Sequence, residues 1–291
     1  MKQRFDMRRK LLAFEENLFK LLMKLSIAII VLVLSLIVFS IFYRGLPSLT
    51  WEMISQTPKG GYYFGKEGGV LNAIVGSLYL AFGATLLALI IGLPVAMLMN
   101  IHLQKLKRFV NSIRFLLDLL WGVPSIVYGA LGFSMMIVLG MKTSLLAGII
   151  TVALFILPIM IRAIDEVLKN VPVGLLEASM SLGSNKNQTA FKVYARQCSS
   201  AIVTAIMISF GRAIGDAASV LFTTGYTDNI PTSLMQPTAT LPLSIFFQLS
   251  SPIKEVQNRA YASAAILTII ILLISVLARI LSNKYNKNKI S

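Results

Sequence analysis

Five long apolar runs in the sequence contain no Asp, Glu, Lys or Arg, and this feature restricts the fold more than any other. A bilayer core about 30 Å thick requires roughly 20 apolar residues of α-helix, because no water is present there to satisfy an open backbone. The chain is therefore expected to cross a membrane as helices. The runs are Leu25–Tyr43, Ala73–Met99, Leu119–Met141, Thr143–Ile161 and Ala260–Ala278.

A sixth segment, Ser199–Gly225, is apolar enough to span but carries Arg212 and Asp216 in its interior. With this segment the sequence predicts an all-α membrane protein with six transmembrane helices, whose two termini lie on the same side.

The composition excludes several other classes of protein. Hydrophobic residues make up 56% of the chain and charged residues only 13%, whereas a soluble domain has about 25% charged residues. The net charge of +15 therefore does not indicate a nucleic-acid partner, since the polar surface that such a protein needs is missing. A single Cys and a single His give no basis for a metal centre, a disulfide framework or a bound cofactor.

The basic residues predict which side of the membrane the termini occupy. Twenty of the 27 Lys and Arg residues fall in segments 1–24, 101–118, 162–198 and the C-terminal tail, and six fall in the opposite loops. Because cytoplasmic loops are enriched in Lys and Arg, both termini are expected inside, in a multi-pass protein of the cell membrane in contact with lipid.

The pattern of charge and hydropathy divides the chain into four expected regions. Residues 1–24 are expected to be either a cytoplasmic amphipathic helix on the anionic leaflet or a plain continuation of the first span. Residues 25–67 hold that span and an outer loop; the span is too long and begins too late for a cleaved secretory signal. Residues 68–281 form a core with five further helices, and residues 282–291 a basic cytoplasmic tail.

The segment Gly211-Arg212-Ala213-Ile214-Gly215-Asp216 places charges inside a span, where each costs at least about 2.5–3.5 kcal/mol. Arg212 and Asp216 are four residues apart, so a continuous helix would place them on one face and allow them to pair. Gly211 and Gly215 leave the backbone beside that face open to close approach. Two interpretations follow: an ion pair that locks two helices, or a guanidinium that meets a passing anion.

The loop 162–198 is the largest connection on the inner side. Pro172 suits the start of a short helix and Gly183 suits its end, so the segment between them offers a helix to a soluble partner. Composition alone also allows a solvated loop helix.

Two sets of residues resemble a known family. Glu177-Ala178-Ser179, followed after three residues by Gly183, is similar to the EAA loop of ABC importer permeases, although Val193-Tyr194-Ala195-Arg196 stands where these proteins usually have Ile-x-Leu-Pro. Three further segments resemble the phosphate-uptake permeases, and Leu241–Phe247 with the short N-terminus resembles their A-type rather than their C-type subunit. Those segments are Gly69–Leu78, Trp121–Gly129 and Gly211–Asp216, the last usually ending in Glu.

The resemblance implies a type I ABC importer permease that pairs with a sister permease around a pathway for inorganic phosphate. It also implies an ATPase dimer docked at Glu177, Ala178 and Gly183, and an extracytoplasmic phosphate-binding protein. The chain has no GxxxxGK[ST] motif, so the expectation is a transport subunit and not an enzyme. The outer loop 222–259 is expected to receive the binding protein, and its apolar piece Leu241–Leu249 to form a re-entrant or interfacial helix.

Two alternatives stay open at this point. A sister oxyanion, such as molybdate, tungstate or sulfate, would be attracted by the same arginine. A secondary anion transporter could use Arg212 and Asp216 with a proton gradient, and would need neither an ATPase nor an EAA helix.

Overall fold

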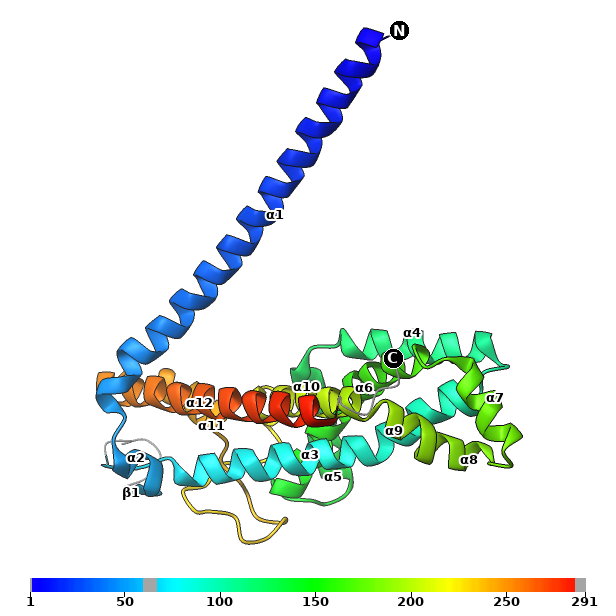
Figure 1. Cartoon of the computed structure of the whole chain (residues 1–291). Helices are drawn as coiled ribbons and strands as arrows, with labels where there is room; N and C mark the ends of the chain where they lie inside the picture. The colour runs from blue at the N-terminus through cyan, green and yellow to red at the C-terminus, as the bar shows by residue number, and fades with distance from the viewer. Residues whose placement is uncertain (1, 60–66, 286–291) are drawn as a thin grey trace.

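The computed structural model describes residues 2–59 and 67–285, and its regular structure is almost entirely helical (Figure 1). In these residues four helices are long and apolar enough to span a membrane alone, and two bent pairs reach that length together. Counting each pair as one crossing gives up to six spans, in agreement with the sequence. The four single helices are α1 (Lys2–Gly45), α3 (Leu71–Met97), α6 (Leu145–Lys169) and α12 (Lys254–Tyr285).

The expected span Leu119–Met141 is wrong as a single helix. The chain forms α4 (Lys107–Trp121) and α5 (Ser125–Val138), which meet at 96°. Pro124 explains the break, because it has no N–H for the preceding turn and it disfavours helical geometry at Val123. Pro124 itself is extended, with φ −57° and ψ 138°. Only α5 is left for the apolar part of this crossing.

The second bent pair turns at Cys198. One arm consists of α8 (Lys186–Gln188), the π-helical turn η3 (Thr189–Tyr194) and α9 (Ala195–Gln197), and the other is α10 (Ser199–Gly215). The arms meet at 78°, so the chain turns back into the bundle without the usual family proline. The expected crossing Ser199–Gly225 also ends early, since the helix stops at Gly215.

The centre of the bundle is the contact between α3 and α6. Ala81, Ala84 and Ala88 of α3 are fully buried, and these small side chains let the two helices approach closely. A Cβ added at Gly83 would lie 2.6 Å from Cδ1 of Ile149 on α6, so a larger residue there would require the Ile149 side chain to move. α3 ends in the π-helical turn η2 (Leu98–His102).

Helix α1 leaves the bundle and touches it only near its own C-terminal end (Figure 1). The helix is continuous from Lys2 to Gly45, so residues 2–24 and the expected span Leu25–Tyr43 form one helix. Gly45 allows close contact with α12, since a Cβ there would lie 2.6 Å from the carbonyl oxygen of Tyr261. Arg44 donates a 3.1 Å hydrogen bond to the Tyr261 hydroxyl. The membrane placement of residues 1–24 stays a prediction.

The end of the bundle where α1 joins carries the loops predicted to face outward. After α1 come η1 (Leu46–Ser48), α2 (Trp51–Ser55) and a short antiparallel pair, β1 (Pro58–Lys59) with β2 (Glu67–Gly68). Helix α11 (Leu241–Leu249) forms over the residues that the sequence suggested. Its first turn is buried against α3 and α12, and the Leu241 N–H donates to Ser77 Oγ at 2.8 Å. This packing favours the re-entrant interpretation.

Helix α12 continues past the expected end at Ala278 as far as Tyr285. Of the basic tail expected at 282–291, residues 286–291 lie outside the described residues.

Candidate functional site

Arg212 lies in the last turn of α10, and its side chain is exposed in the isolated chain. Its guanidinium carbon is 5.0 Å from the centroid of the Phe155 ring on α6. Stacking of this kind orients the guanidinium plane while its N–H donors stay available. Within the described residues Arg212 forms no ion pair or hydrogen bond, so its charge is available to an anion from outside the chain.

The expected pairing of Arg212 with Asp216 is wrong. The i, i+4 geometry requires a continuous helix, but α10 ends at Gly215 and Asp216 is extended, with φ −86° and ψ 126°. The Asp216 carboxylate instead accepts a hydrogen bond of 2.8 Å from the backbone N–H of Ser219. Asp216 therefore caps the turn that follows α10, in the way that Asp side chains commonly cap turns.

The two glycines of this segment leave an open strip beside Arg212, as the sequence predicted. A Cβ added at Gly211 or Gly215 would meet no atom within 4 Å. Gly211 also lines a shallow groove of about 410 Å³ between α10 and α12, together with Thr204 and Ala278. Another helix or a solute can thus approach the backbone of α10 closely on this side.

The predicted coupling helix is present as α7 (Val173–Ser181) and lies at the opposite end of the bundle from α2 and β1 (Figure 1). Pro172 precedes its first residue, as the sequence suggested. Glu177 and Ala178 are exposed, whereas Leu176 and Ser179 are buried. The Ser179 hydroxyl lies 2.9 Å from that of Thr189 in η3, which ties the inner face of α7 to the next segment.

Gly183 ends this helix by a specific geometry. Its φ of +85° is rarely adopted by other residues, and its N–H donates to the Met180 carbonyl at 3.0 Å. The next N–H, of Ser184, donates to the Ser179 carbonyl at 3.2 Å. These two bonds form a Schellman motif, which requires a left-handed residue at this point. Leu182, 87% exposed beside the cap, extends the surface formed by Glu177 and Ala178.

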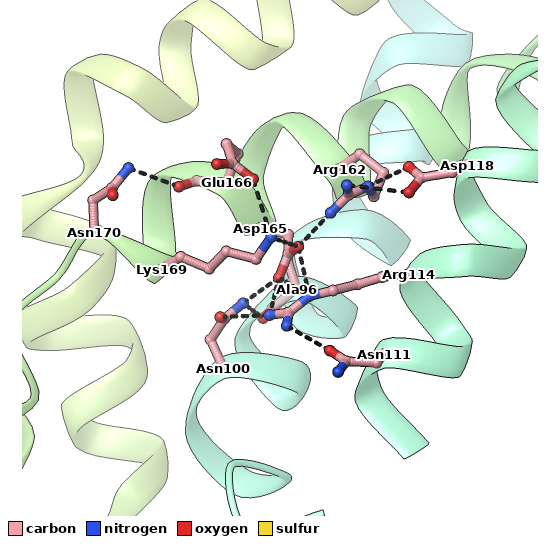
Figure 2. A network of polar contacts seen from close by, with 10 residues as sticks. All are labelled: Ala96, Asn100, Asn111, Arg114, Asp118, Arg162, Asp165, Glu166, Lys169 and Asn170. Carbon is pink, nitrogen blue, oxygen red and sulfur yellow. Dashed lines mark hydrogen bonds and ion pairs between the residues drawn. The ribbon is translucent and has the colours of Figure 1, made fainter. Parts of the chain in front are cut away.

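A buried polar network next to α7 was not predicted from the sequence (Figure 2). Its centre is Asp165 of α6, whose side chain is 0% exposed. Arg114 of α4 donates to both of its carboxylate oxygens, at 2.9 and 3.0 Å, and Arg162 donates at 2.8 Å. Asn100 of η2 donates at 2.8 Å, and the Lys169 ammonium lies 3.4 Å away.

The network fixes three helical segments to one another at the point where α6 leads into α7. Arg162 also pairs with Asp118 of α4, at 2.6 Å, so α4 and α6 are joined twice. A buried carboxylate with this many donors is well satisfied, whereas removing one partner would leave a buried charge unpaired. The network therefore holds the end of α6, from which the chain leads into α7, against α4 and η2.

The sequence contained part of the signal for this network. Arg162, Asp165 and Lys169 have the spacing of one helical face, which local pattern can show. Arg114 and Asn100 join them from 51 and 65 residues away, and no local pattern identifies such partners.

The described part of the chain brings together no group of three or more His, Cys, Asp or Glu residues that could hold a metal ion.

Comparison with known proteins places these features in context. Residues 88–288 match the family described as "Binding-protein-dependent transport system inner membrane component". The phosphate transport system permease protein PstA of Haemophilus influenzae is 31% identical over 248 residues, covering 84% of this chain and 85% of that protein. The PstA protein of Yersinia pestis is 33% identical over 251 residues, covering 85% and 83%.

Solved structures show the same fold. The MetNI methionine ABC transporter in an inward facing conformation aligns with a TM-score of 0.60 at 20% identity, covering 74% of this chain and 95% of the matched chain. An amino acid ABC transporter with histidines aligns with a TM-score of 0.55 at 21% identity, covering 74% and 92%. The fold is thus that of type I ABC importer permeases.

These matches confirm a multi-pass membrane protein that acts as a transport subunit rather than as an enzyme. Importers of this kind work with an ATPase, a partner permease and a substrate-binding protein. The chain belongs to the family of binding-protein-dependent transport system inner membrane components.

Proposed function

We propose that the chain is the A-type permease subunit of an ATP-driven importer of inorganic phosphate. The observation that carries the proposal is its similarity, over most of its length, to proteins named as phosphate transport permeases in bacteria and in the archaeon Methanocaldococcus jannaschii. The archaeal protein is 33% identical over 216 residues, which cover 72% of this chain and 74% of that protein.

Arg212 is the residue that we assign to the anion. A guanidinium offers several N–H donors in a planar fork that matches phosphate oxygens, and charge-assisted bonds of this kind are the strong ones. The free charge of Arg212, its support on Phe155 and the open strip at Gly211 and Gly215 all suit this role. A sister C-type permease would face this side of α10 and complete the pathway.

Asp216 has a different role in this proposal. Its carboxylate accepts from Ser219 N–H, so it fixes the turn after α10 and does not neutralise Arg212. This turn determines where the C-terminal end of α10 lies, and therefore where Arg212 lies.

Helix α7 is the element that we assign to ATPase coupling. Glu177 and Ala178 present its outer face, and Gly183 ends it without occupying space beside that face. One ATPase of the dimer would bind there, and the Asp165 network would carry its movement to α4 and η2. On the opposite side the loop 222–259 would receive the extracytoplasmic phosphate-binding protein.

Uptake by the reconstituted transporter tests the substrate. The chain is placed in vesicles with its sister permease, the ATPase dimer and the binding protein, and entry of radiolabelled phosphate is followed. We expect uptake that requires ATP and is unaffected by excess sulfate, molybdate or tungstate. Uptake driven by a proton gradient without the ATPase, or strong competition by one of these oxyanions, would overturn the proposal.

A further inference from the structure

A cavity of about 580 Å³ lies at the α7 end of the bundle, between η2, α4, α6 and η3. Its charged lining residues among those that the structure describes are all basic: Lys105, Lys107, Arg114 and Lys169. This cavity is distinct from the Arg212 segment, none of whose residues line it.

Two of these four cations, Lys105 and Lys107, give the cavity its net positive charge. Arg114 is paired with Asp165, at 2.9 Å, and Lys169 with Glu166, at 3.0 Å. Lys105 and Lys107 form no ion pair within the described part of the chain. Both lysines are exposed, and a cavity lined by two unpaired lysines and no carboxylate attracts an anion.

The N-terminus of α4 adds to this potential. Leu106 is the N-cap residue of this 15-residue helix, so no side chain caps the first turn, and that turn contains no acidic residue. The residues on both sides of the N-cap, Lys105 and Lys107, line the cavity. Uncapped N–H groups at a helix start carry partial positive charge and bind phosphate oxygens well.

Tyr194 provides a second, independent observation. Its side chain is 2% exposed and lines the cavity, yet its hydroxyl has no hydrogen-bond partner among the described residues. The fully buried side-chain atoms that lack a partner do not include this hydroxyl, so it keeps access to the cavity and can donate to an acceptor there. The hydroxyl comes from η3, opposite α4, and thus offers a donor from the other wall.

We propose that this cavity binds a phosphate group on the cytoplasmic side of the membrane. A phosphate has several acceptor oxygens and up to two negative charges, which match two lysines, a free helix N-terminus and a hydroxyl better than one carboxylate does. Leu103, Val110 and Leu168 add an apolar wall. The group belongs either to inorganic phosphate or to an anionic lipid headgroup, and it occupies a site next to the segment that joins α6 to α7.

The test uses the assembled complex of both permeases and the ATPase dimer, in lipid nanodiscs. One arm measures binding of radiolabelled inorganic phosphate in phosphatidylcholine nanodiscs, with Arg212→Ala present throughout so that the transport pathway does not contribute. The other arm measures how much phosphatidylglycerol the complex retains after its transfer from mixed lipid into detergent.

The double variant Lys105→Ala/Lys107→Ala should weaken one of the two ligands by at least about tenfold. The control Lys186→Ala/Lys192→Ala removes one half-buried and one exposed lysine from the same side of the protein and should bind as before. Loss in the first arm identifies inorganic phosphate, and loss in the second identifies the lipid. Equal binding by the double variant and the control in both arms overturns the proposal.

A measurement on the unsubstituted complex tests the proposal without relying on a variant that could misfold. Phosphate or phosphatidylglycerol should slow the acetylation of Lys105 and Lys107, but not that of Lys186 and Lys192. Absence of protection by either ligand would contradict the proposal. Carbodiimide cross-linking of Lys105 or Lys107 to the ATPase would also overturn it, because an acidic side chain of the partner would then fill the cavity.

Discussion

The guanidinium of Arg212 lies over the ring of Phe155, 5.0 Å from its centroid, and not against a carboxylate. Phe155 is 2% exposed and is itself fixed by an edge contact with Tyr128, at 5.5 Å between ring centroids. The orientation of Arg212 is therefore set by α6 through an apolar contact. Such a contact keeps the cation in place without using its charge.

Arg212→Ala should abolish phosphate uptake and leave assembly intact, because it removes the charge of an exposed side chain whose contact is with the Phe155 ring. Arg212→Lys should retain only part of the activity, since an ammonium lacks the planar fork of donors. Radiolabelled uptake and co-purification of the partner subunits check both variants. Arg196→Ala, which removes another exposed arginine, is the control. Uptake by Arg212→Ala near the unsubstituted level would refute the role of Arg212.

Asp216→Asn should retain uptake, because an amide oxygen can still accept from the Ser219 N–H. Asp216→Ala removes that acceptor and should cost about 1 kcal/mol of stability, the usual cost of a lost cap. Thermal unfolding of the purified complex, together with uptake, separates the two effects. If Asp216→Asn lost uptake as completely as Arg212→Ala, the carboxylate charge and not the cap would be the essential feature.

Gly183→Ala should destabilise the end of α7 by about 1–2 kcal/mol through its φ of +85°, since no atom lies close enough to clash with a new Cβ. Gly183→Asp adds a charge at the docking surface and should release the ATPase. Co-purification of the ATPase and uptake are the measurements. Gly174→Ala is the matched control, because Gly174 is equally uncrowded but has no positive φ. Normal ATPase binding and uptake by Gly183→Asp would disprove the coupling role.

Asp165→Asn should lower the stability of the assembled permease by about 3–5 kcal/mol, because Arg114 and Arg162 would lose their buried counter-charge. Glu166→Gln should have little effect, since Glu166 is exposed and pairs only with Lys169. Thermal unfolding of the two variants in the same detergent compares them directly. Equal melting temperatures would show that the network does not stabilise this end of the bundle.

Sequence reasoning was most accurate where one local rule decides the structure. The long apolar runs predicted the spans, since a bilayer permits few other structures. Pro172 and Gly183 bracketed α7, and Leu241–Leu249 matched α11, because proline, glycine and an apolar run are local signals. In each case the residues that define the element lie within it or directly beside it.

The remaining features depend on contacts between distant residues or on competing local ones. The end of α10 at Gly215 separated Arg212 from Asp216, although the i, i+4 spacing alone favoured a pair. The break at Pro124 divided an apolar run that hydropathy could not resolve. Arg114 and Asp165 meet only because α4 folds back over α6, so their spacing along the chain does not predict the contact.

The unbroken length of α1 has a mechanical consequence. Its 44 residues would extend about 66 Å at 1.5 Å per residue, roughly twice the hydrocarbon thickness of a bilayer. With the run Leu25–Tyr43 in the lipid, the preceding part reaches about 35 Å beyond it as a rigid lever. A tilt of about 10° at Gly45 would swing the far end by roughly 11 Å, so small movements where α1 meets α12 are amplified at the N-terminal end of the helix.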